Sequence, residues 1–430
     1  MAEQFTQLAA VEVGYHGQRV GVLAIDPKSQ VPVFEYYPDW LDTSQDLAPL
    51  KLRSVLGPQT FPELRNTSFR GAPGLVADSL PGQFADLLTN AWLSGHGIQP
   101  GQITVVDRLG YVGERGMGAL TFRPAVREDL TQLPSVVNLS ETTKAARAAI
   151  SGTLQSDDAG ATLQHLLDTS GSAGGARAKA AIALGPNNEV ISGQHDAPAD
   201  HTHWLLKFDV AKGQSAGHST GLAQVEFAYH LMAVQAGLEM TECRLLKADG
   251  LTHFLTRRFD RPGPTSRLHV QSLAAISHLP PENPGAHTYE QFLQTCLSLD
   301  LPAEDRRKAF RQVTFNFVAA VRDDHTKNLA FIYEDGSWRL APAFDLTFPF
   351  LDGGGWLLQH QMTIAGSPHG VRREQLLELA DRAVVAKAGA IIDDVEYGVR
   401  NWTEHAEAAE VPPALTECIH AELSTTALSP

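Results

Sequence analysis

The chain is short of cysteine and of basic residues, and both shortages exclude classes of protein. Its three cysteines are odd in number and far apart, so they match neither a disulfide framework nor the paired spacing of a zinc site. Lysine and arginine number 34 against 49 aspartates and glutamates, which gives a net charge of −15. Because nucleic acid attracts positive charge, unaided binding to it is not the expected function. A basic partner would still bring the protein to nucleic acid.

Long hydrophobic runs are also missing. No apolar stretch approaches the ~18 residues that a membrane span needs. The start of the sequence has Glu3 and no basic segment before an apolar run, so it does not read as a secretory signal. With 430 residues, of which 43% are hydrophobic and 19% charged, the composition is that of a globular protein of two or three domains. We expect a cytoplasmic protein without a membrane partner.

Hydrophobic patterning predicts strands near the start of the chain. Residues 11–24 alternate apolar and polar side chains around His16-Gly17, which is typical of a β-hairpin. The further elements predicted in this part of the chain are a helix over 83–94, a strand over 203–209 and a helix over 222–238.

The chain beyond residue 264 is predicted to be mainly helical. One predicted helix ends beside Asp323 and carries on one face Phe310, Val313, Phe317 and Val321. Another is lined by Leu376, Ala380, Val384, Ala388, Ile391 and Val395. We therefore expect an α+β fold in three parts, with a β-rich domain over 1–130, strands and a helix over 131–262, and a helical part over 263–430.

The first candidate site is the segment Asp323-Asp324-His325-Thr326-Lys327-Asn328. Asp323 and Asn328 have the spacing of the base and the metal-holding asparagine in the catalytic loop of protein kinases. This chemistry needs a carboxylate to orient or deprotonate a hydroxyl, and a neighbouring oxygen ligand for Mg²⁺. The alternative is that the segment is only a helix end and a turn.

Asp345 is a second candidate. It follows a predicted hairpin in which LAFIYE and SWRL are joined by a turn at Asp335-Gly336. A kinase places its second metal-binding carboxylate just beyond such a hairpin. The alternative is an aspartate that caps or closes a turn.

A glycine-rich segment from Ser170 to Lys179 lies between a helical stretch and a strand. Its glycines would let backbone N–H groups approach phosphates closely, although the segment is neither a Walker A loop nor G-x-G-x-x-G, and a flexible linker is the alternative. Lys207 lies in a strand among apolar residues, and Glu226 lies on the next helix. A buried lysine needs a partner or a phosphate, because an unpaired buried charge is costly. The alternative is an edge-strand lysine in solvent.

The order of these parts along the chain is that of a two-lobed phosphotransferase. The residues within each motif indicate a particular family. The segments GSAGGARAK, HWLLKFD, FLTRRFDR, DDHTKN and LAPAFDL, with SFRGAPGLVADSLP and DRLGYVGERGMGAL before them, resemble the HipA family of toxin kinases over nearly the whole chain. Two features depart from protein kinases. His325 follows Asp323, whereas in protein kinases the histidine precedes the aspartate, and no D-F-G is present. The resemblance implies an α+β, two-lobed, protein-kinase-like fold with a β-rich N-terminal domain and a mostly helical C-terminal lobe.

The same resemblance implies a function. Members of the family look like ATP- and Mg²⁺-dependent serine/threonine kinases that act as toxins of type II toxin–antitoxin modules. The implied partner is a HipB-like DNA-binding antitoxin, which would connect the acidic chain to operator DNA indirectly. Relatives suggest a protein substrate connected with translation, such as a translation factor or an aminoacyl-tRNA synthetase.

Roles follow by motif. Asp323 would be the catalytic base, Asn328 and Asp345 the Mg²⁺ ligands, and Lys207 the residue that holds the ATP phosphates, with Glu226 as its ion-pair partner. The other implied nucleotide-binding residues are Gly174, Gly175, Ala176, Arg177, Ala178 and Lys179 of the glycine loop, Arg257, Arg258 and Phe259 of a connector that meets adenine through its backbone, and His325, Lys327, Asn328, Phe344 and Asp345. Ser172 falls where the family has an autophosphorylated serine, with Ser170 as the alternative.

Two rival functions stay open. One is a catalytically weak scaffold that serves only as co-repressor with an antitoxin, although a scaffold has no reason to keep Lys207, Asp323, Asn328 and Asp345 together. The other is a small-molecule phosphotransferase of the same fold. The crowded residues His195, Asp196, Asp200, His201 and His203 favour a polar loop over a metal site. Trp204, Trp338 and Trp356 are predicted to be core or rim residues.

Overall fold

The computed structural model describes residues 7–125, 136–151, 166, 177–210, 219–351 and 356–426. The chain folds into two compact units. The first unit comprises Met1–Val210, Arg257–Gln271 and Ala275–Pro280. The second unit comprises Ala211–Thr256, Ser272–Ala274 and Pro281–Pro430. The chain therefore passes from one unit to the other several times.

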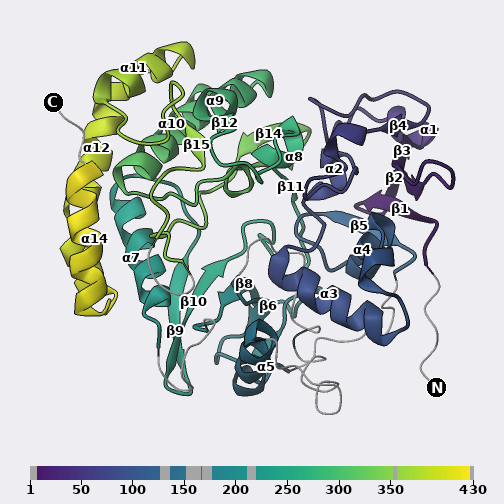
Figure 1. The fold of residues 1–430 in the computed structure, drawn as a ribbon, viewed down its shortest axis with the longest axis horizontal. Helices are drawn as coiled ribbons and strands as arrows, with labels where there is room; N and C mark the ends of the chain where they lie inside the picture. The colour runs from purple at the N-terminus through teal and green to yellow at the C-terminus, as the bar shows by residue number, and fades with distance from the viewer. Residues whose placement is uncertain are drawn as a thin grey trace. The chain divides into compact units, whose positions relative to one another are not determined.

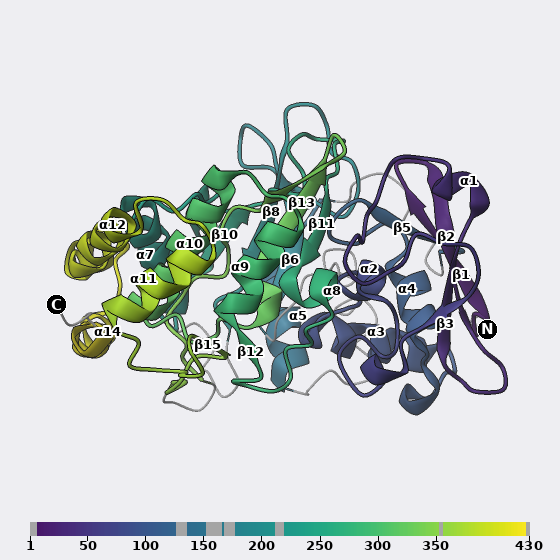
Figure 2. The ribbon, with the colours of Figure 1, turned by 90° about the horizontal axis from the view of Figure 1, so that it is seen from above.

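An antiparallel five-stranded sheet opens the first unit (Figures 1 and 2). Its strands are β1 (Ala10–Tyr15), β2 (Gln18–Ile25), β3 (Pro32–Tyr36), β4 (Gln59–Thr60) and β5 (Leu120–Arg123), in the order β4-β3-β2-β1-β5. The predicted hairpin is confirmed, because β1 and β2 pair around His16-Gly17, whose positive φ angles of 47° and 77° suit a tight hairpin turn. Helix α4 (Val105–Val112) packs on this sheet and begins at a capping box between Thr104 and Asp107.

The rest of the first unit is a set of short helices and three more strands. The predicted helix over 83–94 is confirmed as α3. The helices are α1 (Pro38–Leu41), α2 (Gly74–Ala77), α3 (Gln83–Gly95) and α5 (Leu139–Ser151), with 3₁₀ turns η1 (Pro62–Leu64) and η2 (Pro100–Gln102). The strands are β6 (Lys179–Leu184), β7 (Val190–Ser192) and β8 (Thr202–Lys207), with β6 paired antiparallel to both neighbours. Strand β8 is the one predicted from HWLLKFD.

The second unit is mostly helical. Its helices are α7 (Leu222–Gln235), α9 (Tyr289–Ser298), α10 (Ala303–Val318), α11 (Arg373–Arg382), α12 (Ala388–Arg400), α13 (Trp402–Ala408) and α14 (Pro413–Thr426). Its strands form the hairpins β9 (Cys243–Ala248) with β10 (Leu251–Arg257) and β13 (Ala330–Glu334) with β14 (Ser337–Leu340), and the short parallel pair β12 (His287–Thr288) with β15 (Met362–Thr363). Strand β11 (His269–Ser272) and helix α8 (Leu273–Ser277) lie where the chain changes unit. Helix α12 lies beside α7 and α10 (Figures 1 and 2).

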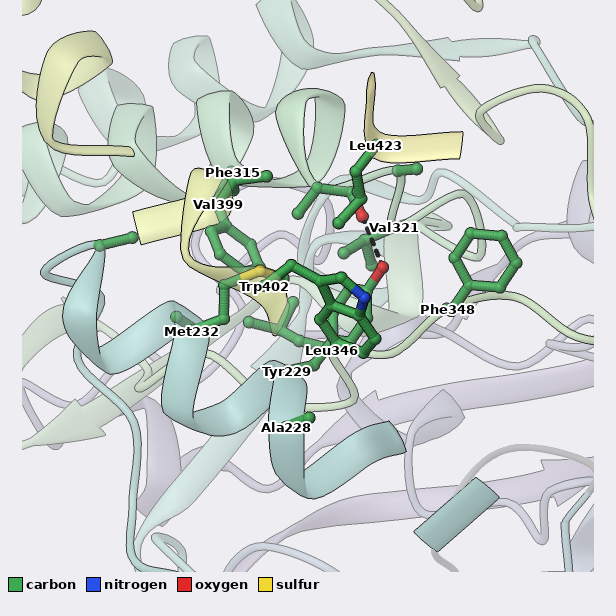
Figure 3. Close-up of a cluster of buried hydrophobic side chains, with 14 of the residues drawn as sticks. Ala228, Tyr229, Met232, Phe315, Val321, Leu346, Phe348, Val399, Trp402 and Leu423 are labelled. Carbon is green, nitrogen blue, oxygen red and sulfur yellow. Dashed lines mark hydrogen bonds between the residues drawn. The ribbon is translucent and has the colours of Figure 1, made fainter. Parts of the chain in front are cut away.

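A buried hydrophobic cluster joins these helices to the segments that carry the candidate site (Figure 3). Helix α7 contributes Tyr229 and Met232, and Trp402 packs against them. The Tyr229 hydroxyl donates to the carbonyl of Ala319 at 2.9 Å, just after α10 ends. Val321 belongs to the same cluster. The end of α10 is therefore fixed by packing and by a buried hydrogen bond.

Two predicted helices differ from the structure. Helix α10 ends at Val318, because Ala320 takes a left-handed conformation (φ 51°) and the Val321 N–H donates to the Asn316 carbonyl at 2.9 Å, so Val321 lies beyond the helix. The face predicted to run from Leu376 to Val395 belongs to two helices, α11 and α12. They are separated at Val384, which is left-handed (φ 54°) and exposed.

The predicted fold class is confirmed: the chain is α+β, with a sheet-rich start and a mostly helical second unit. Helix α7 also matches its prediction, and Gly237 (φ 80°) follows its C-terminal end. Within the part of the chain that the structure describes, no helix is both long and apolar enough to cross a membrane.

Candidate functional site

The segment that follows α10 presents Asp323. Beyond the left-handed Ala320 the chain forms neither helix nor strand until the 3₁₀ turn η4 (Thr326–Asn328), and His325, just before that turn, has an extended backbone. The side chain of Asp323 is 56% exposed, and that of His325 is 27% exposed. The carboxylate of the predicted base is therefore accessible from solvent.

Asn328 closes this loop onto Asp323. Its side-chain Nδ2 donates to the main-chain carbonyl of Asp323 at 2.8 Å, and His325 Nε2 lies 4.0 Å from Asp323 Oδ1. Because the amide nitrogen of Asn328 is used in this way, its Oδ1 is the atom that can be offered to a metal ion. The structure therefore brings together three residues that the sequence predicted for one site, with Lys327 in the same turn.

Asp345 lies at the same end of the β13–β14 hairpin as Asn328. Phe331 pairs with Leu340, and the Ala341 N–H donates to the Ala330 carbonyl at 3.0 Å, so the residues before β13 and after β14 leave the hairpin together. Asp345 is half-buried and left-handed (φ 56°), a conformation that aspartate tolerates better than most residues.

The packing of its neighbour supports this placement. Leu346 and Val321 belong to one buried cluster, as Figure 3 shows. Leu346 follows Asp345 directly, and Val321 precedes Asp323 by two residues. The same core therefore positions the segment that carries the predicted base and the segment that carries the predicted metal ligand. Carboxylate and amide oxygens are ligands that Mg²⁺ accepts.

In the first unit, two lysines lie side by side. Lys179 of β6 and Lys207 of β8 are directly opposite each other, and their exposed fractions are only 6% and 4%. The alternative that Lys207 is a solvent-exposed edge lysine is therefore wrong. Ala178, just before β6, is buried, and its carbonyl accepts from the Phe208 N–H at 3.0 Å. Two neighbouring cations on one sheet face form a surface that favours an anionic group such as phosphate.

The connector Arg257-Arg258-Phe259 is fixed by a buried ion cluster. The Arg258 N–H donates to the His203 carbonyl at 2.9 Å, and its guanidinium binds the Asp260 carboxylate, with Nη2 2.7 Å from Oδ2. Asp260 Oδ2 also accepts from Arg261 Nη1 at 2.8 Å. The Arg258 guanidinium and N–H are thus both used inside the protein, and the contact of the connector with adenine stays a prediction.

Burial and charge oppose each other at Asp260. Burial alone would raise the pKa of its carboxyl, but the guanidinium groups of Arg258 and Arg261 outweigh burial and hold the pKa well below its usual range. The main-chain N–H of Gly118, from the glycine-rich segment before β5, donates to the same carboxylate at 2.8 Å. Asp260 and Arg261 were not among the residues predicted for the site, although both stand in the FLTRRFDR motif.

Several predicted residues cannot be placed together. Glu226 is buried on α7 in the second unit, whereas Lys207 lies in the first, so their ion pair stays a prediction. Phe344, next to Asp345, is half-buried.

Part of the predicted glycine loop, with its serines, lies outside the described residues. These residues are Ser170, Ser172, Gly174, Gly175 and Ala176.

The histidine-rich loop and the tryptophans have ordinary structural surroundings. His201 Nδ1 lies 2.7 Å from Asp200 Oδ1, and His203 Nε2 lies 2.9 Å from the Pro264 carbonyl. Trp204 and Trp338 are buried, and Trp356 is half-buried against the core of the second unit. The prediction that these tryptophans are core or rim residues is confirmed.

A group of buried polar residues beside Asp323 was also missed. Asp324 is 1% exposed and accepts hydrogen bonds from Tyr289, His360 and the main chain of Gln361. Tyr289 and His360 lie 35 and 36 positions away from Asp324 in the sequence. No spacing rule connects residues that far apart. The signal that the sequence offered for this group was the second aspartate in DDHTKN.

Comparison with known proteins gives two family matches. Residues 171–403 match the family model of the HipA-like C-terminal domain, and residues 11–123 match that of the HipA N-terminal domain. The first match covers more than half of the chain. A curated relative, the putative kinase Y4mE of Sinorhizobium fredii (strain NBRC 101917 / NGR234), is 27% identical over 124 residues, which are 27% of this chain and 30% of that protein. The chain thus matches less than a third of the length of this relative.

Solved structures add a likeness of fold. The chain is similar to one in the complex of the Shewanella oneidensis MR-1 toxin–antitoxin system HipA, HipB and its operator DNA, with a TM-score of 0.66 and 15% identity, over 97% of this chain and 95% of that one. The proinflammatory kinase CtkA of Helicobacter pylori is 12% identical over 60% of this chain and 95% of that one, but its TM-score of 0.33 is too low to carry an argument.

Proposed function

The chain belongs to the HipA family, and we propose that it is a protein serine/threonine kinase that uses ATP and Mg²⁺. The observation that carries this proposal is the loop Asp323–Asn328. In this loop an exposed carboxylate stands beside an asparagine whose Nδ2 is tied to the Asp323 carbonyl at 2.8 Å. The hairpin β13–β14 delivers Asp345 to the same end of the second unit. These residue types are the ones that phosphoryl transfer requires.

Asp323 would accept the proton of the acceptor hydroxyl while the hydroxyl oxygen bonds to the γ-phosphorus of ATP. The bond from that phosphorus to the bridging oxygen breaks, and ADP leaves. General-base assistance of this kind contributes about 10²- to 10⁴-fold in rate. His325, whose Nε2 lies 4.0 Å from the Asp323 carboxylate, would contact the transferred group.

Lys179 and Lys207 would bind the phosphates of ATP. Their side-by-side burial on β6 and β8 supports this role, because an anion between them reduces the repulsion of two like charges. The connector Arg257–Phe259 would meet adenine through its backbone.

The donors for a metal ion are present. Asn328 Oδ1 and the carboxylate of Asp345 are hard oxygen ligands, and they would hold Mg²⁺ between them. Bound Mg²⁺ would neutralise charge on the phosphates during transfer. These donors suit Mg²⁺ because the hydrogen bond from Asn328 to Asp323 uses the amide nitrogen of Asn328 and not its oxygen.

We further propose that the protein works with a HipB-like DNA-binding antitoxin. The solved structure with the same fold was determined as a complex with HipB and operator DNA. A net charge of −15 makes a basic DNA-binding partner chemically suitable. The protein substrate would be a protein of the translation machinery.

Transfer from ATP labelled in the γ-phosphate tests the proposal. Purified protein is incubated with Mg²⁺ and labelled ATP, alone and with a cell extract, and labelled proteins are separated from labelled small molecules. Asp323→Asn should lose transfer. Asp300→Asn, at an exposed aspartate after α9, should keep it.

Each rival has its own result in this experiment. Label that appears only in small molecules would indicate a small-molecule phosphotransferase. An absence of transfer together with tight binding to an antitoxin would indicate a co-repressor scaffold. Either result would reject the kinase proposal.

A further inference from the structure

Asp323 stands between two buried neighbours in the sequence. Arg322 and Asp324 are buried, with exposed fractions of 7% and 1%, whereas the side chain of Asp323 is 56% exposed. Along Arg322-Asp323-Asp324 an exposed side chain is thus flanked by two buried ones. The direction of the Asp323 carboxylate therefore depends on how its two neighbours are fixed.

Asp324 is fixed by three hydrogen bonds. Its Oδ2 accepts from the Tyr289 hydroxyl at 2.7 Å and from His360 Nδ1 at 2.8 Å, and its Oδ1 accepts from the Gln361 N–H at 2.7 Å. Because an ionised carboxylate only accepts, His360 carries a proton on Nδ1. Hydrogen bonds to a charged group are about twice as strong as neutral ones, so this small set holds the residue firmly.

The partners of Asp324 are themselves held. The Tyr289 oxygen accepts from Asn316 Nδ2 at 2.8 Å, which links the loop to the last turns of α10. Burial, and then the charge of Asp324, raise the pKa of the Tyr289 hydroxyl, so this group keeps its proton and donates. The ring of His360 stacks on Phe317 with 4.0 Å between ring centroids.

Arg322, on the other side of Asp323, reaches the same segment. Its guanidinium binds Glu422 of α14 and donates to the Leu357 carbonyl at 3.2 Å. The Gln361 side chain donates back to the Arg322 carbonyl at 3.3 Å. The residues from 357 to 361 thus contact both neighbours of the predicted base.

We propose that Asp324 is a positioning residue, whose buried carboxylate fixes the backbone on which Asp323 meets the acceptor hydroxyl. This inference rests on the proposed kinase activity. Asp324 is too deeply buried to touch a substrate, so it acts through the loop. A misplacement of about 1 Å at a reacting group can cost about 10²-fold in rate. Most nucleotide contacts are assigned outside this loop, to Lys179, Lys207 and the connector, so the effect should appear mainly in kcat and much less in the KM for ATP.

Asp324→Asn is the test, and Asp305→Asn is its matched control. Asp305 of α10 is equally buried, at 1% exposed, and also accepts three hydrogen bonds, two from Arg339 at 2.6 and 3.1 Å and one from the Leu340 N–H at 3.1 Å. Both variants should melt at a lower temperature. Measured well below both melting temperatures, only Asp324→Asn should lower kcat, by about 10- to 100-fold, with a KM for ATP within about twofold of the original.

A second pair of variants separates positioning from folding. His360→Asn keeps an N–H donor near the place of Nδ1, whereas His360→Leu has none. His360→Asn should retain several times more activity than His360→Leu at equal folded fraction. Equal kcat losses in Asp324→Asn and Asp305→Asn, or no difference between the His360 variants, would overturn the inference.

Hydrogen–deuterium exchange of the full chain gives a readout that does not depend on activity. The peptide covering residues 320–328 should exchange faster in Asp324→Asn and stay as in wild type in Asp305→Asn. If the wild type transfers no phosphate but this peptide loosens, the kinase proposal fails while Asp324 is still shown to hold the loop. If exchange there is unchanged, the inference itself is wrong.

Discussion

Lys179 and Lys207 lie directly opposite each other across the antiparallel strands β6 and β8, and both are buried. Side chains in such a pair project from the same face of the sheet, with Cβ atoms about 4.5–5.5 Å apart. Like charges at this separation repel, and a low-dielectric surrounding strengthens the repulsion. Two cations on one face of the sheet agree with the role in binding the ATP phosphates that is proposed for both lysines.

Lys207→Met should therefore weaken ATP binding and abolish phosphoryl transfer in a folded protein. A hydrogen bond to a charged group contributes about 1.5–3 kcal/mol, so we expect at least about tenfold weaker binding. The measurement is the rise of the melting temperature with Mg·ATP, since a ligand of the folded state stabilises it. Lys247→Met, at a lysine whose side chain is 63% exposed, is the control. An undiminished rise in Lys207→Met would show that Lys207 does not contact ATP.

Asp323→Asn should remove catalysis and spare nucleotide binding. The carboxylate acts on the acceptor hydroxyl, so its loss should lower kcat by about 10²- to 10⁴-fold. Single-turnover transfer and the ATP-induced shift in melting temperature measure the two effects separately. A variant that kept more than about a tenth of the wild-type rate would show that another group is the base.

Asp345→Ala should weaken the response to Mg²⁺. Loss of one of two protein oxygen ligands should raise the Mg²⁺ concentration for half-maximal ATP binding by about tenfold or more. Asp335→Ala is the matched control. Asp335, at the tip of the β13–β14 hairpin, is also a left-handed aspartate, with a φ of 49° against 56° at Asp345. If the two variants respond equally to Mg²⁺, Asp345 is not a ligand.

Asp260→Asn should destabilise the first unit, because it leaves the buried guanidinium groups of Arg258 and Arg261 without their carboxylate. Removing one partner of such a cluster costs about 3–5 kcal/mol of unfolding free energy, measurable by urea unfolding. Asp200→Asn, at a carboxylate whose side chain is 61% exposed, should cost less than about 1 kcal/mol.

The pH dependence of this difference follows from the lowered pKa of Asp260. A carboxyl whose pKa is lowered by folding stabilises the protein fully above its unfolded pKa of about 3.9 and loses that contribution as the pH falls through its folded pKa. The difference between wild type and Asp260→Asn should be constant from pH 5 to pH 8, and should shrink only below about pH 4. A difference that already changes near pH 6 would contradict the assignment.

Ser172 should be phosphorylated by the protein itself, and the modification should switch it off. A phosphate adds about −1.5 to −2 charges, which would repel the triphosphate that the glycine-rich segment is proposed to bind. Mass spectrometry after incubation with Mg·ATP should find phosphate on the peptide 168–179, and none on Asp323→Asn unless wild-type enzyme is added. Ser170→Ala, which keeps Ser172, should still be modified. An unmodified peptide with a fully active Ser172→Glu would reject the switch.

The sequence by itself determined the elements whose signals are local. The turn His16-Gly17 between alternating residues specifies the β1–β2 hairpin, and apolar spacing closed by Gly237 specifies α7. The spacing of Asp323 and Asn328 also sufficed to predict that the two residues lie together. A hydrogen bond closes the loop between them within six consecutive residues. Such interactions depend on neighbours in the chain, so a pattern in the sequence can represent them.

Tertiary structure decided everything that depends on residues far apart. The break between α11 and α12 at Val384 has no glycine or proline to announce it, so the periodic pattern continues across it. The register that sets Lys179 against Lys207, and the contact of Asp324 with His360, join segments whose separation in sequence carries no rule. Burial converts these residues from solvated charges into fixed ones, and only the folded chain determines which charges are buried.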